Sequence, residues 1–374
     1  MGSCEVLIIG GGPAGSSCAR RLHEAGVDTV VLDKSAFPRD KVCGGWITPA
    51  VVRELEIDLD EYGQGRVLQS ITGFRTGRMG GPEIATDYGC AVSYGIRRVE
   101  FDDYLLRRCG ARLILGTLLR SIERSGDSWL VNGAIRARLL IGAGGHFCPV
   151  ARLLGATARE ENAVAAQEIE FELSAEQREA CAVRGEAPEL YFCPDLKGYG
   201  WCFRKGDFLN IGLGRLDAHL LPGHVSEFVR WLKGTGKVRF DLPAAMRGHA
   251  YLIFRETTRP IVGDGVLLIG DAAGLAYSQS GEGIRPAIES GLLAAKAIVE
   301  ADGQYAQERF EGYRAALTAR FGERQSDWLT RVGRRLPTSW MQSVAGGLLG
   351  THWFSRRVVL DRWFLHANEP ALDC

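Results

Sequence analysis

The 374-residue chain has no excess of charge of either sign, because its 45 lysines and arginines balance 45 aspartates and glutamates. It therefore lacks the basic field that holds a phosphate polymer, and we do not expect nucleic-acid binding. The ten cysteines are scattered singly, with no C-x-x-C pair. That spacing favours reduced thiols in a reducing compartment, and no cysteine or histidine spacing predicts a metal site.

Long apolar runs are missing as well. No run reaches the roughly 18 residues that read as a membrane-spanning helix. The apolar N-terminal stretch has neither a basic n-region nor an A-x-A cleavage site, so we interpret it as a buried strand. We expect a cytoplasmic protein that does not span a membrane and leave peripheral membrane contact open.

The first 33 residues predict a β-α-β unit. Residues 6–9 form an apolar strand, 16–25 a helix and 27–32 a second, β-branched strand. Between them, Gly10-x-Gly12-x-x-Gly15 permits a tight turn, close approach of a pyrophosphate, and packing of helix on strand. Asp33 ends the second strand, where a carboxylate accepts hydrogen bonds from ribose hydroxyls. The unit therefore predicts a dinucleotide site on a parallel sheet.

The character of the chain changes twice after this unit. Residues 163–255 contain short alternating runs that predict a separate antiparallel sheet. From Ile261 the chain returns to an apolar strand, a glycine-rich turn and a helix over 283–300. Residues beyond 323 are predicted to be helical, and no internal repeat or low-complexity linker interrupts the chain.

Two more glycine turns follow apolar strands, at Gly142-Ala143-Gly144-Gly145 and at Gly270-Asp271-Ala272-Ala273-Gly274. The second is followed by Ser280-Gly281-Glu282-Gly283-Ile284 at a helix start. In this order and separation, the three turns resemble those of the FAD-dependent group that includes aromatic hydroxylases, flavin halogenases and geranylgeranyl reductases. The resemblance covers residues 5–300.

The resemblance implies an FAD site. Asp271 is expected to hydrogen-bond the ribityl chain, and the helix that starts near Gly283 and Ile284 to direct its positive end at the flavin pyrimidine edge. Arg98 matches an arginine near the cofactor. The residues expected to bind FAD are Gly10, Gly12, Pro13, Ala14, Gly15, Asp33, Lys34, Cys43, Gly44, Gly45, Arg98, Gly142, Ala143, Gly270, Asp271, Gly281, Gly283 and Ile284. Gly144 stands where the group usually has aspartate, so any contact of that carboxylate is absent.

Two segments indicate the geranylgeranyl reductase branch. The segment from Pro38 to Gly45 looks like the P-x-x-x-x-C-G-G loop of these reductases, in which a cysteine and glycines lie against the isoalloxazine. The segment Tyr199-Gly200-Trp201-Cys202-Phe203 is similar to their Y-x-W-x-F strand, and its three aromatic residues share one face, suited to an apolar chain. Arg204 replaces the usual proline. Each segment alone reads as core; together they favour a site with Tyr199, Trp201 and Phe203 as substrate contacts.

The predicted activity is reduction of a carbon–carbon double bond of a lipophilic isoprenoid by hydride from reduced FAD. Cys43 is the candidate catalytic residue, either as proton donor or as a pocket wall, with Tyr199 a weaker candidate. NAD(P)H or a ferredoxin would supply electrons. Two alternatives stay open: a monooxygenase that hydroxylates an aromatic substrate with NAD(P)H and oxygen, and a flavin-binding electron carrier without a small-molecule substrate.

The predicted fold class is α/β, with a Rossmann-like FAD-binding domain, an inserted antiparallel-sheet substrate domain and a helical C-terminal region. We assign residues 1–65, 96–160 and 256–322 to the FAD-binding domain, 66–95 and 161–255 to the substrate domain, and 323–374 to the C-terminal region. The C-terminal region contains apolar residues that could line a lipid tunnel or contact a bilayer, with core packing as the alternative. These candidates are Trp340, Leu348, Leu349, Trp353 and Phe354.

Overall fold

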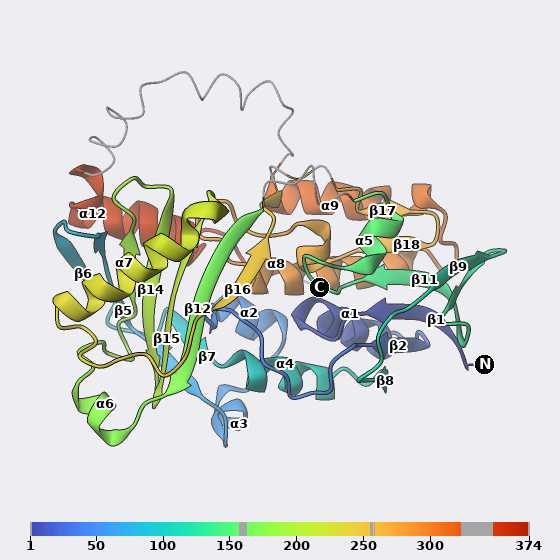
Figure 1. The fold of residues 1–374 in the computed structure, drawn as a ribbon. Helices are drawn as coiled ribbons and strands as arrows, with labels where there is room; N and C mark the ends of the chain where they lie inside the picture. The colour runs from blue at the N-terminus through green and yellow to red at the C-terminus, as the bar shows by residue number, and fades with distance from the viewer. Residues whose placement is uncertain (1, 157–162, 255–256, 258, 323–346, 373–374) are drawn as a thin grey trace.

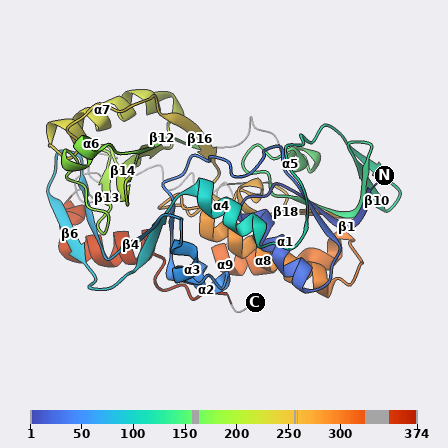
Figure 2. The same cartoon turned by 90° about the horizontal axis from the view of Figure 1, so that it is seen from below.

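The computed structural model describes residues 2–156, 163–254, 257, 259–322 and 347–372. Two sheets lie side by side, with α2, α4 and α8 between them (Figures 1 and 2). The α/β fold with a nucleotide-binding part and a second sheet is confirmed. Within the described ranges, no helix combines the length and the apolarity needed to cross a bilayer.

The first sheet has eight strands in the order β17-β18-β11-β1-β2-β8, with the β9–β10 hairpin added beside β11. Its strands are β1 (Gly2–Ile9), β2 (Thr29–Leu32), β8 (Arg112–Ile114), β9 (Ile122–Ser125), β10 (Ser128–Val131), β11 (Ile135–Gly142), β17 (Val262–Gly263) and β18 (Val266–Leu268). Strand β1 pairs in parallel with both β2 and β11, and β11 with β18. Three segments far apart in the sequence thus form one sheet centre.

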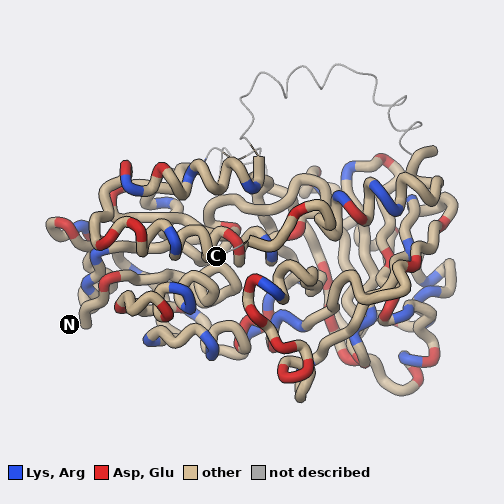
Figure 3. Tube along the Cα trace, turned by 180° about the vertical axis from the view of Figure 1, so that it is seen from behind, with Lys and Arg blue, Asp and Glu red and all other residues tan. Residues whose placement is uncertain are grey.

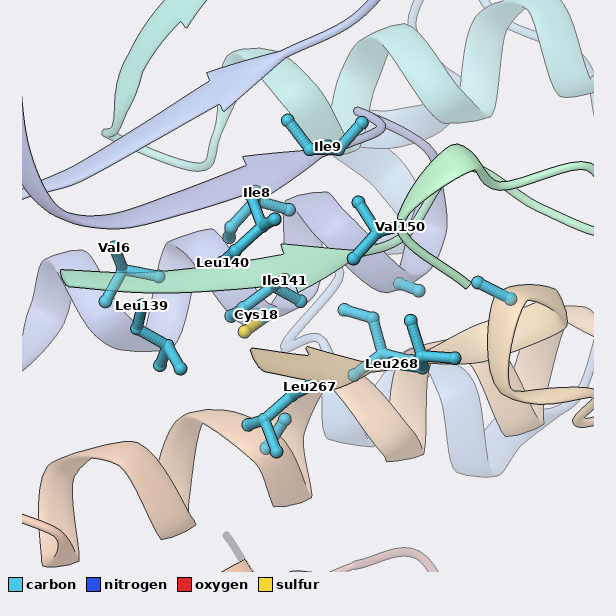
Figure 4. Close-up of a cluster of buried hydrophobic side chains, with 14 of the residues drawn as sticks. Val6, Ile8, Ile9, Cys18, Leu139, Leu140, Ile141, Val150, Leu267 and Leu268 are labelled. Carbon is cyan, nitrogen blue, oxygen red and sulfur yellow. The ribbon is translucent and has the colours of Figure 1, made fainter. Parts of the chain in front are cut away.

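The central strands β1, β11 and β18 consist mostly of apolar residues, as expected for strands that are covered on both faces of the sheet. Val6, Leu140 and Leu267 are fully buried (Figure 4). Continuous apolar runs are the expected sequence of such central parallel strands. The hairpin β9–β10 was not predicted from the sequence.

The second sheet has seven strands in the order β16-β12-β15-β14-β13-β5-β6. They are β5 (Gly73–Arg78), β6 (Glu83–Asp87), β12 (Val164–Glu172), β13 (Glu189–Phe192), β14 (Gly198–Lys205), β15 (Phe208–Arg215) and β16 (Arg247–Tyr251). The sequence analysis predicted an antiparallel sheet. One pair of strands differs from that prediction, since β13 runs parallel to β5, whereas neighbours such as β12 and β15 or β14 and β15 are antiparallel. A three-stranded sheet of β3 (Trp46–Ile47), β7 (Ser93–Ile96) and β4 (Leu68–Ile71) lies beside it.

The helices cover these sheets. They are α1 (Pro13–Glu24), α2 (Pro49–Glu54), α3 (Leu59–Gly63), α4 (Arg98–Arg107), α5 (Pro149–Leu153), α6 (Ala175–Glu179), α7 (Leu221–Gly234), α8 (Ile284–Glu300), α9 (Glu311–Phe321) and α12 (His352–Phe354). Phe228 and Leu232 of α7 share a buried cluster with Ile169 and Ile211 of the second sheet. Helix α7 therefore closes one face of that sheet, and the other face is left for the site.

The C-terminal region continues from α12 into a π-helical segment, Ser355–Phe364. Phe364 lies edge-on to Tyr199, with 5.1 Å between ring centroids. Leu349 is buried in the same cluster, whereas Leu348 and Trp353 are exposed. Trp340 lies outside the described residues. Some of the apolar residues of this region, such as Leu349 and Phe364, therefore pack in the same cluster as the aromatic residues of β14, and others are exposed.

Charges of both signs are interspersed along the trace in both halves of the molecule (Figure 3). The described part of the trace therefore shows no long stretch that carries charges of one sign only.

Helices α1 and α8 cross so closely that a Cβ at Gly291 would lie 2.4 Å from the carbonyl oxygen of Ala14. We predict that Gly291→Ala lowers the free energy of unfolding by about 1–3 kcal/mol, because the backbone must shift to admit one methyl group. Thermal unfolding measures this. Gly312→Ala in α9 is the matched control, since its Cβ would meet open space and helix propensity favours alanine. Equal melting temperatures for the two variants would contradict the prediction.

Candidate functional site

A cavity of about 670 Å³ runs between the two sheets. One end is lined by the first glycine turn, Asp33 and Lys34, and the other by the aromatic strand β14. Of the residues predicted to bind cofactor or substrate, those in its wall are Gly10, Gly12, Pro13, Ala14, Asp33, Lys34, Cys43, Gly44, Gly45, Arg98, Ala143, Tyr199, Trp201, Phe203, Asp271, Gly281, Gly283 and Ile284. The fold thus brings most of the predicted positions into one space.

Three predicted positions lie outside the cavity wall and serve close packing. A Cβ at Gly15 would lie 1.9 Å from the carbonyl oxygen of Gly10. At Gly142 a Cβ would meet Leu268 at 2.5 Å, and at Gly270 it would meet the Cβ of Ala14 at 3.0 Å. These glycines shape the strand-to-helix corners without lining the cavity themselves.

The nucleotide end of the cavity is organised by backbone groups. Asp33 accepts hydrogen bonds from the N–H groups of Gly11 (2.7 Å) and Ser35 (2.8 Å). A carboxylate has about four lone-pair positions, so both oxygens keep capacity for ribose hydroxyls. Neither α1 nor α8 has a side-chain cap at its N-terminus. Their free N–H groups and positive dipole ends are suited to a pyrophosphate and to an anionic reduced flavin ring.

Arg98 is a buried residue of the cavity wall. Its guanidinium donates to both oxygens of Asp102, at 2.7 and 2.8 Å, and Arg39 also reaches Asp102, at 3.0 Å. Two cations sharing one buried carboxylate leave a net positive charge at this wall. That charge is suited to phosphate or to an anionic ring.

Lys41 and His249 lie near Asp271. The Lys41 ammonium is 3.0 Å from Nδ1 of His249. Burial, followed by the charge of Lys41, lowers the pKa of His249 to about 3, and burial also lowers the pKa of Lys41. His249 is therefore neutral, and its ring nitrogen accepts a hydrogen bond from the Lys41 ammonium. This pair faces the position where the ribityl chain is expected.

The loop that carries Cys43 is held by side chains of the second sheet. The Cys43 N–H donates to Glu168, and the Cys43 carbonyl accepts from Asn210 at 3.2 Å. The Gly44 carbonyl accepts from the buried ammonium of Lys205 at 3.0 Å, and Lys205 also donates to Ile96 at 2.9 Å. These bonds fix the backbone of Cys43 and Gly44 against the sheet.

The aromatic wall follows from the register of three strands. Tyr199, Trp201 and Phe203 of β14 lie opposite Gly214, Gly212 and Asn210 of β15. The next strand, β12, places Ala166, Glu168 and Glu170 opposite those three residues. The small residues of β15 leave room for the aromatic rings. A Cβ at Gly212 would lie 2.3 Å from the indole of Trp201 and 2.8 Å from Glu168.

Two acids in the cavity wall were missed by the sequence analysis. Burial raises the pKa of both Glu168 and Glu282 to about 7. Within the part of the chain that the structure describes, one oxygen of Glu168 and both oxygens of Glu282 are buried without a hydrogen-bond partner. The structure places Glu168 opposite Gly212, which is also the partner of Trp201, and this register is not visible in the sequence. The alternation of Glu168 with Ile169 is typical of a solvent-facing residue.

Comparison with known proteins agrees with this geometry. The FAD binding domain family matches residues 3–56. The chain is 29% identical over 335 residues to the menaquinone reductase of Mycobacterium tuberculosis (strain H37Rv), covering 80% of this chain and 78% of that protein. It is 28% identical over 344 residues to digeranylgeranylglycerophospholipid reductase 3 of Methanosphaera stadtmanae, covering 86% and 84%.

The fold is also shared with a solved structure, a geranylgeranyl bacteriochlorophyll reductase-like protein from Thermoplasma acidophilum. The TM-score is 0.77 at 22% identity, covering 99% of this chain and 97% of that one. The class is therefore that of FAD-dependent oxidoreductases. Within that class, the chain is similar to the digeranylgeranylglycerophospholipid reductase and shares the fold of the geranylgeranyl bacteriochlorophyll reductase-like protein named above.

For the cofactor site, we predict that Asp271→Ala weakens FAD binding about 10- to 100-fold. Loss of one charge-assisted hydrogen bond, worth about 1.5–3 kcal/mol, gives this range. Flavin fluorescence during titration of the apoprotein measures the dissociation constant. Asp127→Ala, at an exposed position outside the cavity wall, is the control and should bind FAD as the unaltered protein does. Unchanged FAD affinity in Asp271→Ala would remove Asp271 from the cofactor contacts.

Proposed function

We propose that this protein reduces carbon–carbon double bonds in the isoprenoid chain of a lipophilic substrate. The observation that carries the proposal is the union, in one cavity, of a dinucleotide-binding end with an aromatic wall and the Cys43 loop. Apolar walls with few polar groups are typical of sites for lipophilic ligands. The two curated relatives support the same class, because menaquinone and digeranylgeranylglycerophospholipid both carry an isoprenoid chain.

In this proposal, reduced FAD supplies hydride, and the protein supplies orientation and the one proton that the reaction needs. Tyr199, Trp201 and Phe203 bind the chain over the loop of Cys43, Gly44 and Gly45. An isolated alkene is a poor hydride acceptor, so placement of the double bond contributes a large part of the rate. Cys43 lies at the reacting end, either as a proton donor or as a wall. NAD(P)H or a ferredoxin is the proposed source of electrons, and contact with a membrane surface would deliver the lipid.

The test is anaerobic. The FAD-loaded protein is reduced with dithionite, a geranylgeranyl lipid is added, and flavin absorbance and product mass are followed. We expect reoxidation together with a gain of two mass units per reduced bond. The saturated phytanyl lipid is the matched control and should leave the flavin reduced. Reoxidation only after oxygen and an aromatic compound are supplied would contradict the proposal and indicate a hydroxylase.

The aromatic wall gives a second prediction. Trp201→Ala should raise KM for the isoprenoid lipid about 10-fold or more, because it removes a large apolar contact of the chain. Steady-state kinetics across lipid concentrations measure the change. Trp353→Ala is the matched control, since Trp353 is 67% exposed and lies outside the cavity wall. A rise in KM in the control alone would move the lipid contact from the cavity to the surface.

A further inference from the structure

Glu168 has the position expected of a proton donor. It lies on β12 in the cavity wall and is 3% exposed. One carboxylate oxygen accepts from the Cys43 N–H, and the other is buried without a partner among the described residues. A buried ionised carboxylate with an unpartnered oxygen is costly, so this environment favours the protonated acid in the cavity wall.

The neighbours of Glu168 place the acid beside the aromatic wall and the Cys43 loop. Gly212, its cross-strand partner, is also the partner of Trp201, so acid and indole lie against the same glycine. The hydrogen bond to Cys43 ties the acid to the loop that carries the thiol. Glu168 therefore borders both the aromatic wall and the Cys43 loop. Glu282, the other buried acid, acts electrostatically on Tyr199 of the aromatic wall but has no hydrogen bond to the Cys43 loop among the described residues.

We propose that Glu168 is the proton donor of the alkene reduction and that Cys43 is a wall of the pocket. This inference rests on the proposed function. In the step, hydride bonds to one alkene carbon, and the π electrons form a bond between the other carbon and the proton of Glu168. The O–H bond of the acid breaks, and the resulting carboxylate takes up a proton from the solvent, which restores the acid. The substrate gains two electrons, and the cofactor is oxidised by two.

The charges around Glu168 allow this role at neutral pH. Burial raises its pKa most, the Cys43 N–H, the Lys205 ammonium and Asn210 lower it, and Glu170 on the same strand raises it. The net result of these effects is a pKa of about 7. Arg247, opposite Glu168 on β16, is paired with Asp40 at 2.5 Å. Because the acid form is the donor, the rate of alkene reduction should fall as pH rises through about 7.

The test compares Glu168→Gln with the unaltered protein. Glutamine still accepts a hydrogen bond from the Cys43 N–H but cannot donate a proton as an acid, so FAD content and melting temperature should stay near their original values. We expect flavin reoxidation by the geranylgeranyl lipid to slow at least about 100-fold and to lose its fall near pH 7. Glu172→Gln, an exposed position on the same strand, is the matched control and should react normally.

A second readout does not depend on turnover. In an infrared pH titration, the difference between the unaltered protein and Glu168→Gln should show a protonated carboxyl band that disappears as pH rises through about 7. An acid band with a midpoint near pH 4 would overturn the proposal. This measurement isolates Glu168 from Glu282, whose pKa burial also raises to about 7.

The kinetic outcomes separate the two proposals. If Glu168→Gln reacts within about 3-fold of the unaltered protein, Glu168 is not the donor and the reductase function stands. If Glu168→Gln is active but Glu282→Gln or Cys43→Ser does not react, the residue changed in the inactive variant is the proton donor instead. If the unaltered protein itself does not react with the lipid, the proposed function fails, and this step fails with it.

Discussion

The site depends on the attachment of the Cys43–Gly44 backbone to the second sheet. Glu168, Asn210 and Lys205, from three different strands, each bond one group of this backbone. All three side chains are almost fully buried, so none of these bonds is weakened by competing water. Because the loop belongs to the segment after the first β-α-β unit, these bonds join the nucleotide-binding part to the aromatic wall.

The attachment has an electrostatic cost that the structure offsets locally. Lys205 is buried, and its ammonium is compensated by Glu170 and by the carbonyl oxygens of Gly44 and Ile96. A buried cation without such partners would lose its proton or destabilise the fold. Glu168 has no ion pair among the described residues, and burial raises its pKa more than the charge of Lys205 lowers it, which favours its neutral form. The same junction thus contains one satisfied charge and one acid that retains its proton near neutral pH.

Much of this architecture follows from local sequence. The turn at Gly10 to Gly15, the acid at Asp33 and the later turn at Asp271 specify local conformations, and the structure places them around one cavity. Glu168 was not predicted because its strand alternates acids with Ile169 and Phe171, a pattern typical of one solvated face. Both faces of β12 are in fact covered, one by α7 and the other by the Cys43 loop. Such coverage is a tertiary property that periodicity alone does not contain. The parallel pairing of β13 with β5 is likewise set by long-range assembly.

The central claim is that one cavity holds FAD and an isoprenoid chain together, with the acid of Glu168 beside the bond that is reduced. The most direct measurement is a crystal structure of the FAD-loaded protein with a saturated phytanyl lipid bound. We predict the chain against Trp201, with two adjacent carbons between the flavin ring and the free oxygen of Glu168. A lipid bound elsewhere on the protein, or a flavin ring that excludes the chain from Glu168, would contradict the account.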